Sequence, residues 1–324
     1  MKQKWYCILA IILCFSPIQI LAQDELYLGG NSIGIEIKYN GVYVSGTYPI
    51  NESIDPSDTF SPGDIIQQID HQEVTDIQTF YMILKEHKNP INTLDVTLLR
   101  DGETIRASMH SIYDTKRHSV SCGLYIKEKM SGVGTMTYYD PSSQRFGALG
   151  HTIEKWDGRG NGYLYDAAVI SYTKAFPSAT GKKQADINYD NVIATIDQNT
   201  SIGIYGNYQF LPDHLISLPW AKSEEVMIGK AEMYTVLDGE KVENFKIEIT
   251  DLHPNTQDDM KGIEFVVTDT HLLHTTGGII QGMSGSPIVQ NGKIVGAVTH
   301  VVTSDPKKGY GVLIEHMLQY TRSS

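Results

Sequence analysis

The stretch that decides the fold is GGIIQGMSGSPIVQNGKIVGAVTH, residues 277–300. Ser284 stands in it between Gly282 and Gly285, so the chain can turn tightly there and leave the serine hydroxyl open. A serine becomes a nucleophile only when a base takes its proton and nearby donors stabilise the oxyanion that forms. We expect the backbone N–H groups of Gly282 and Ser284 to be those donors.

The residues that follow Ser284 predict a β-barrel. A strand, an Asn291-Gly292 hairpin, a strand containing VGAVT and a GYGV strand come in that order, and Asn-Gly between apolar runs is a strong hairpin signal. This layout resembles the C-terminal barrel of chymotrypsin-like serine proteases, where GDSGGP precedes a similar hairpin. Met283 stands where those proteases carry an acid, and Ser286 replaces their second glycine. Activation by insertion of a freshly cut N-terminus is therefore not expected.

A catalytic base is expected upstream of Ser284 in such a fold. His151, in RFGALGHTIEKWDG, follows small residues at a strand end and begins a loop, as the histidine of chymotrypsin-like proteases does. His300, on the strand after the hairpin, is the alternative. Two aspartates could orient the base, Asp269 before Ser284 and Asp197 after His151. Spacing does not decide between them, and either could simply cap a turn.

Residues 23–112 predict a separate unit of strands with one helix near 77–87, which Asp76 would begin. Its segment SPGDIIQQIDHQEV resembles the PDZ modules of bacterial exported proteases. Such a module binds a peptide C-terminus while the peptide adds as a strand, and the sequence SIGI would form the carboxylate-binding loop. The loop residues are Ser32, Ile33, Gly34 and Ile35. The alternative is a small β domain that packs on its neighbour without binding peptide.

Length, charge and cysteine content exclude several classes. A chain of 324 residues is long enough for two cores. A net charge of −12 argues against non-specific nucleic-acid binding, which needs a basic surface. His271 and His274 in HLLH lack a third ligand at a suitable spacing, so we expect no metal and no other cofactor. Cys122 is alone in the body of the chain and is expected to be a small buried residue.

The N-terminus, MKQKWYCILAIILCFSPIQILAQ, has two lysines before an apolar run. This pattern predicts a signal peptide or a membrane anchor over residues 1–22, and hence an exported protein that is either anchored or secreted. The expected organisation is then a PDZ domain over 23–112 and a catalytic domain over 113–324. The expected fold class is mainly β, a chymotrypsin-like double β-barrel preceded by the PDZ domain.

Four features together resemble the SpoIVB peptidase family, the stage IV sporulation protein B of endospore-forming bacteria. They are the long serine motif, ALGHTI, NTSIGIYG and the PDZ-like unit. The resemblance covers nearly the whole chain and implies a triad of His151, Asp269 and Ser284. It also implies a protease that cleaves itself and a membrane-associated regulator in the space between the forespore membranes. The rival hypothesis is a catalytically degenerate scaffold that binds peptide without cutting it.

Overall fold

The computed structural model describes residues 24–153, 161–254 and 259–322. The expected signal peptide or anchor lies outside these ranges. The described chain is mainly β, with short helical segments between strands. These are α1 (Ile77–Glu86), α2 (Thr270–Thr276), α3 (Ile314–Arg322) and the 3₁₀ turns Pro56–Asp58, Ser223–Glu225 and Asp259–Lys261. None of the helices in the described ranges combines the length and apolarity needed to cross a membrane.

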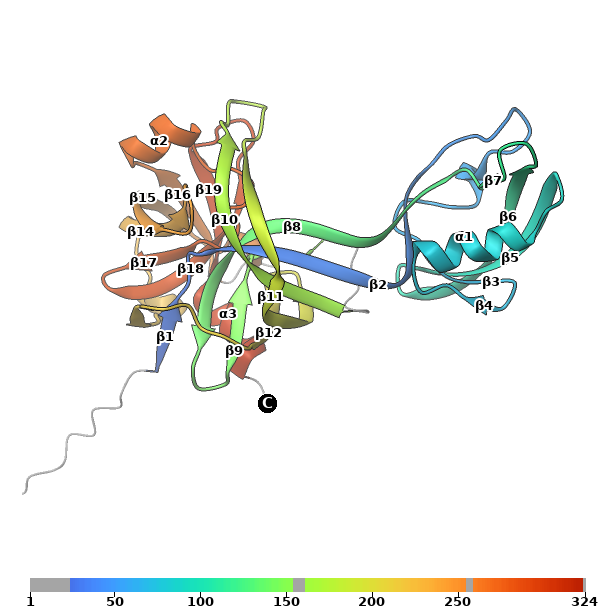
Figure 1. The fold of residues 1–324 in the computed structure, drawn as a ribbon. Helices are drawn as coiled ribbons and strands as arrows, with labels where there is room; N and C mark the ends of the chain where they lie inside the picture. Colours follow the sequence, from blue (N-terminus) through green and yellow to red (C-terminus); the bar gives the residue numbers. More distant parts are fainter. Residues whose placement is uncertain (1–23, 154–160, 255–258, 323–324) are drawn as a thin grey trace, which may run out of the picture.

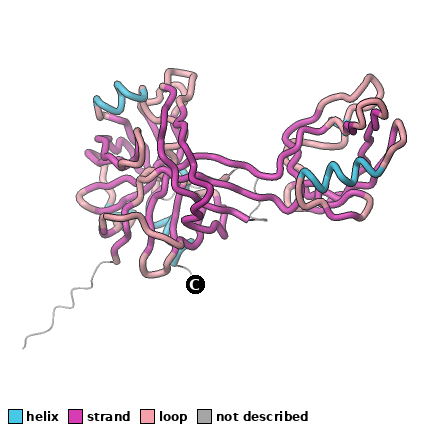
Figure 2. The backbone as a smooth tube through the Cα atoms, in the orientation of Figure 1, coloured by secondary structure: helices cyan, strands magenta, loops and turns pink. Residues whose placement is uncertain are grey.

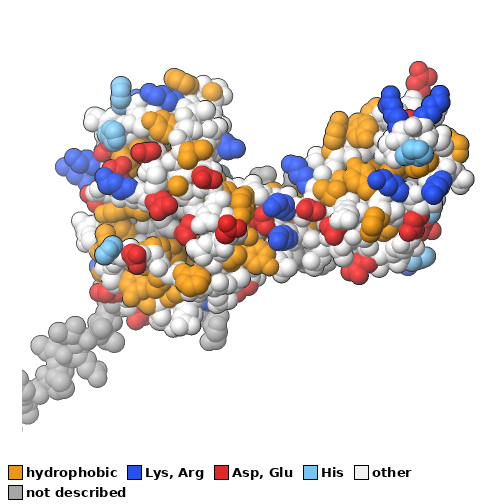
Figure 3. All heavy atoms as spheres, in the orientation of Figure 1, with side chains coloured by type: hydrophobic (Ala, Val, Ile, Leu, Met, Phe, Trp, Pro, Cys, Tyr) orange, Lys and Arg blue, Asp and Glu red, His pale blue; other side chains and the backbone are white. Residues whose placement is uncertain are grey.

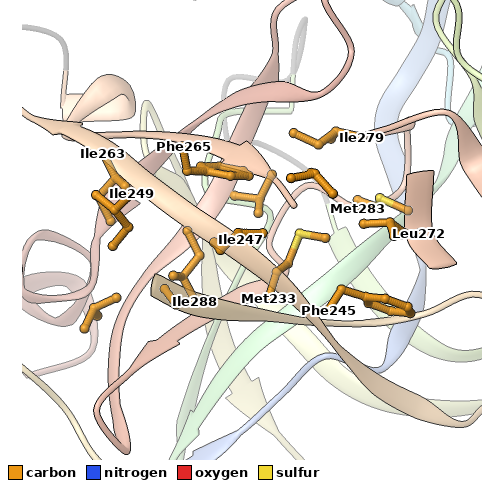
Figure 4. Packing of buried hydrophobic residues seen from close by; sticks show 14 of the residues in the cluster. Met233, Phe245, Ile247, Ile249, Ile263, Phe265, Leu272, Ile279, Met283 and Ile288 are labelled. Carbon is orange, nitrogen blue, oxygen red and sulfur yellow. The ribbon is translucent and has the colours of Figure 1, made fainter. Parts of the chain in front are cut away.

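Six strands in the C-terminal half form a closed barrel. In barrel order they are β14 (Gly229–Val236), β15 (Val242–Leu252), β16 (Ile263–Val267), β19 (Lys308–Leu313), β18 (Lys293–Val301) and β17 (Pro287–Gln290). Met233, Phe265 and Ile288 pack inside it (Figure 4). The predicted hairpin is confirmed: Asn291 and Gly292, with φ of 52° and 75°, join β17 to β18. Positive φ at both residues is what a two-residue hairpin turn of type I′ requires.

Another ring of six strands precedes this barrel in the chain, so it is called the first ring and the closed barrel is called the second barrel. Its members are β2 (Ser32–Thr47), β8 (Leu124–Asp140), β9 (Arg145–Ala148), β12 (Gly203–Tyr208), β11 (Lys182–Thr200) and β10 (Asn161–Thr173). Each pairs with the next, and β10 pairs back to β2, so the ring closes. Two short strands, β1 (Glu25–Leu28) and β13 (Ser217–Pro219), extend it beside β8. The expected double β-barrel is confirmed.

A PDZ-like unit lies at the far ends of β2 and β8 (Figures 1 and 2). It consists of those strand ends, α1, β3 (Ile65–Ile69), β4 (Gln72–Glu73), β5 (Ile91–Arg100), β6 (Glu103–Asp114) and β7 (Ser119–Ser121). Its own core runs from Val42 to Leu124. Figure 3 shows the unit and the barrels as two masses joined by a narrower stretch.

The predicted domain boundaries need correction. Ser32–Lys38 pair with β8 and β10 inside the first ring, although the sequence assigned them to the PDZ domain. The strand pairing between β2 and β8 continues from Ser32↔Thr135 to Thr47↔Leu124, so it crosses from one unit into the other. The PDZ-like unit is therefore inserted into the first ring and does not precede it. Uninterrupted strands leave no break in composition, which is why this insertion could not be predicted from the sequence.

Local predictions in the PDZ-like unit are confirmed. Helix α1 begins at Asp76, whose carboxylate accepts a hydrogen bond from the Thr79 N–H at 2.6 Å. Cys122 is a free thiol in the core, only 3% exposed. Burial raises the pKa of Cys122 to about 11, so the thiol stays protonated and unreactive at neutral pH.

Candidate active site

A cavity of about 800 Å³ holds the candidate site. Its wall includes Gly282 and Ser284 from the loop before β17, His151 from the loop after β9, and His300 from β18. The structure thus brings the expected nucleophile and base to one place, together with the alternative base. A larger hollow of about 1060 Å³ beside β10 and β11 is lined by several carboxylates and contains none of these four residues.

Glycine is required on both sides of Ser284. The φ angles of Gly282 and Gly285 are +95° and +91°, a region that side chains rarely adopt. A Cβ atom at position 285 would lie 2.1 Å from the carbonyl oxygen of Thr135, and one at position 282 would lie 3.1 Å from the side chain of Lys183. The tight turn predicted from the sequence is therefore confirmed, and the loop packs closely against the first ring.

Two N–H groups of this loop, those of Gly282 and Ser284, are left without an acceptor among the described residues. In a planar trans peptide the N–H points opposite to the preceding carbonyl. The Gln281 carbonyl accepts from the Lys183 N–H at 2.9 Å, and the Met283 carbonyl accepts from the Ser286 N–H at 3.0 Å. The N–H groups of Gly282 and Ser284 therefore point the other way, and neither has an acceptor among the described residues. Two such unpartnered donors are what an oxyanion site needs.

The Ser284 hydroxyl is held by the main chain. Its Oγ donates to the carbonyl oxygen of Thr299 at 3.1 Å, and in the described chain no hydrogen bond joins it to His151. A change of the χ1 rotamer would redirect the hydroxyl. Bonds between nucleophile and base are often long before substrate binds, so this geometry is compatible with catalysis.

His151 is oriented by its own loop. Its Nδ1 lies 2.8 Å from the carbonyl oxygen of Thr152, which can only accept, so Nδ1 carries the proton and Nε2 keeps a free lone pair. Asn199 braces this loop. It accepts from the Ile153 N–H at 2.8 Å and from the Thr152 hydroxyl at 3.1 Å, and donates to the Ile153 carbonyl at 3.0 Å. The His300 ring lies 5.5 Å from the His151 ring, centroid to centroid.

The structure does not bring Asp269 to His151. Asp269 is the N-cap of α2: its carboxylate accepts from the Leu272 N–H at 3.0 Å and from the Lys246 N–H at 3.3 Å. It is not part of the cavity wall. Asp197 is also engaged elsewhere, since it accepts two hydrogen bonds from Arg145, at 2.6 and 2.9 Å. Among the described residues, neither candidate acid contacts His151.

Asp269→Asn separates the two roles of this residue. Asparagine caps helices about as well as aspartate, so a capping residue tolerates the change. A triad acid does not, because the amide favours the wrong histidine tautomer and turnover falls about 10⁴-fold. We expect kcat of Asp269→Asn within a few-fold of the wild type, whereas Asp269→Ala loses about 1 kcal/mol of stability. Steady-state kinetics and thermal melts measure both, and a loss of several orders of magnitude in Asp269→Asn would restore Asp269 to the triad.

Met283 fills the core of the second barrel. It is buried, and Figure 4 shows its side chain next to Leu272. The position that is acidic in related barrels thus points inward here, where an unpaired carboxylate would be costly. This explains the methionine that the sequence singled out.

The predicted carboxylate-binding loop is wrong. Its residues lie in β2 of the first ring, with β8 paired along one side and β10 along the other, so no edge is left for a peptide strand. The affected residues are Ser32, Ile33, Gly34 and Ile35. The PDZ-like unit has a different edge: Leu124–Lys127 of β8 pair, among the described strands, with β2 alone. Helix α1 lies near this segment, since the Ile77 N–H donates to Glu128 at 3.3 Å.

A buried lysine lies behind the nucleophile loop. Lys183 is 1% exposed, and its Nζ donates to the hydroxyl of Thr235 at 2.8 Å. Burial lowers the pKa of Lys183 to about 7 from its usual 10.5. No sequence signal pointed to this residue, because a lysine in an alternating strand is normally solvated.

Lys183 should make stability depend on pH. The unfolded chain keeps the proton up to pH 10.5, whereas the native protein releases it near pH 7, so the unfolding free energy rises with pH across this window. One such group contributes at most about 1.4 kcal/mol per pH unit. We expect Lys183→Met, which keeps the apolar stem, to show a shallower rise between pH 7 and 9. Denaturant melts at several pH values measure the slope, and equal slopes would contradict the shifted pKa.

Comparison with protein-family models finds a match to the family described as SpoIVB peptidase S55, over residues 118–318. The chain belongs to this family. The matched region of the SpoIVB peptidase runs from β7 to α3 and contains both Ser284 and His151. The resemblance stated from the serine motif is confirmed, and the protein is a serine endopeptidase.

A search of curated proteins finds no match for this SpoIVB peptidase. Among solved structures, the Rv3671c protease from M. tuberculosis in its active form is similar, with 16% identity, 60% of this chain and 75% of that chain covered, and a TM-score of 0.35. The inactive form of the Rv3671c protease has 15% identity, with 59% of this chain and 84% of that chain covered and a TM-score of 0.32. The PDZ domain of the SdrC-like protein from Listeria monocytogenes has 20% identity, with 28% of this chain and 90% of that chain covered and a TM-score of 0.24.

Proposed function

We propose that Ser284 is the nucleophile of this endopeptidase and His151 its general base and acid. The observation that carries the proposal is the single cavity that joins Ser284, His151 and two unpartnered backbone donors. Nε2 of His151 takes the Oγ proton as Oγ attacks the scissile carbonyl carbon. The negative oxygen of the tetrahedral intermediate accepts from the N–H groups of Gly282 and Ser284.

The same histidine completes the reaction. It gives the proton to the leaving amine as the C–N bond breaks, and an acyl-enzyme ester on Ser284 remains. A water molecule, deprotonated by Nε2, then attacks this ester and releases the carboxylate product. The Thr152 carbonyl and the Asn199 brace support this cycle because they keep the Nδ1 proton in place and the Nε2 side turned to the cavity.

For the biological role, we propose a sporulation signalling protease that acts outside the cytoplasmic membrane. It would cleave itself near the N-terminus and a membrane-associated regulatory protein, in the space between the forespore membranes. The family supports this role by its name, and the lysines before the apolar run of residues 5–21 support export or anchoring. The PDZ-like unit would bind a peptide C-terminus, and the single-sided pairing of Leu124–Lys127 favours that edge for it.

The N-terminal residue of the protein made in cells tests self-cleavage and export together. We expect the wild type to carry a new N-terminus beyond residue 22 that Ser284→Ala does not have. Identical N-termini in both would contradict self-cleavage. An intact Met1 in the soluble cytoplasmic fraction of both would contradict export.

A further inference from the structure

Thr135 of β8 contacts both halves of the candidate site. It is completely buried, its N–H donates to the Ser284 carbonyl at 3.0 Å, and its hydroxyl donates to the Gly282 carbonyl at 2.6 Å. Its own carbonyl accepts from the Leu149 N–H at 3.4 Å, two residues before His151. One residue of the first ring thus joins the segment that carries the base to the loop that carries the nucleophile.

We propose that Thr135 is a positioning residue, whose hydroxyl holds the oxyanion-binding loop in its active conformation. The inference rests on the proposed function of Ser284 and deepens it. Glycine adopts positive and negative φ about equally readily, so the sequence of the loop alone does not fix the peptide planes around Gly282. The 2.6 Å bond fixes the plane that follows Gly282, while the Lys183 N–H fixes the plane that precedes it.

The contact is specific to the hydroxyl. A buried carbonyl that loses its hydrogen-bond donor pays a desolvation cost. The peptide that contains the Gly282 carbonyl would therefore reorient to find another donor. That carbonyl belongs to the Gly282–Met283 peptide, which stands between the peptides that carry the N–H groups of Gly282 and Ser284. Rotation of this middle peptide would change the relative orientation of the two N–H groups, so they would no longer converge on the place where the oxyanion forms. Such a defect lowers kcat more than it raises KM, because the oxyanion exists only in the transition state and the intermediate.

The chain offers a matched control on the same strand. Thr137 is as buried as Thr135, and its hydroxyl donates to the carbonyl of Gly285 at 2.8 Å. Gly285 supplies no proposed oxyanion donor. Thr135→Val and Thr137→Val therefore remove equivalent hydrogen bonds between the same strand and the same loop, and only the first removes a bond to a residue that supplies an oxyanion donor.

The test uses the full chain and two probes, a fluorophosphonate and fluorescein-labelled casein. In the first, Oγ of Ser284 forms a bond to phosphorus, fluoride leaves, and the proton goes to His151, so the labelling rate reports the same geometry as peptide attack. We expect Thr135→Val to lower both the labelling rate and kcat by about 10- to 100-fold with KM within a few-fold. Thr135→Ser should stay near the wild type, and Thr137→Val within a few-fold of it.

The outcomes separate the inference from the proposed function. If the wild type labels and cleaves no better than Ser284→Ala, the proposed function fails. The inference fails if the wild type is active and the folded Thr135→Val variant has the same labelling rate and kcat as the wild type or as Thr137→Val. Rates are taken per folded molecule, with thermal melts as the check. Thr135→Ala, which also lacks the hydroxyl and adds no bulk, serves if Thr135→Val does not fold.

Discussion

Ser284→Ala is expected to lower kcat by about 10⁶-fold, the loss measured when the nucleophile of a studied serine protease is removed. The reason is that alanine cannot form the acyl-enzyme at this position, so only binding and oxyanion stabilisation remain. The fold should persist, because the Oγ of Ser284 makes a single hydrogen bond among the described residues, to the Thr299 carbonyl. Cleavage of labelled casein and circular dichroism measure the two effects.

Ser286→Ala is the matched control for this variant. Ser286 lies two residues further along the same loop, is buried, and its hydroxyl has no hydrogen-bond partner among the described residues. Removing that hydroxyl breaks no bond, so activity and stability should both stay close to the wild type. If the wild type is active and Ser284→Ala cleaves as fast as Ser286→Ala, Ser284 is not the nucleophile. If the wild type itself does not cleave casein, the scaffold hypothesis from the sequence replaces the catalytic role of Ser284.

His151→Ala is expected to reduce kcat by a factor similar to that of Ser284→Ala. Nucleophile and base act as one unit, so losing either costs nearly as much as losing both. His300→Ala is the control, since His300 also lies on the cavity wall and its ring is 5.5 Å from that of His151. We expect its kcat within about 10-fold of the wild type, because positioning effects are smaller than loss of the base.

The double variant makes this comparison sharper. If Ser284 and His151 act together, Ser284→Ala with His151→Ala should be no worse than either single variant. A large loss in His300→Ala with a small one in His151→Ala would exchange their roles.

Local sequence signals predicted local structure well. Asn291-Gly292 formed its hairpin, Asp76 capped its helix, and the glycines around Ser284 formed the tight turn, because each depends on φ preferences or on bonds to near neighbours. His151 could be predicted because a histidine between small residues at a strand end is a local pattern. The fold class and two of the candidate site residues, Ser284 and His151, could therefore be predicted from local features.

Features that depend on long-range pairing could not be predicted in this way. SIGI has the composition of a binding loop, yet β10 and β8 take both of its edges, and neither neighbour is close in sequence. Thr135 and Asn199 are ordinary polar residues within strands, and only the fold brings them to the loops that they hold. The family resemblance implied Asp269 as the acid, but the helix that begins at Thr270 uses its carboxylate as a cap.

The most direct test of the central claim is the site of fluorophosphonate labelling, located by mass spectrometry of the digested full-length protein. We expect a single adduct on Ser284, formed rapidly in the wild type, strongly slowed in His151→Ala and retained in His300→Ala. An adduct on another serine, or labelling of Ser284 at the same rate with and without His151, would contradict a catalytic pair of Ser284 and His151.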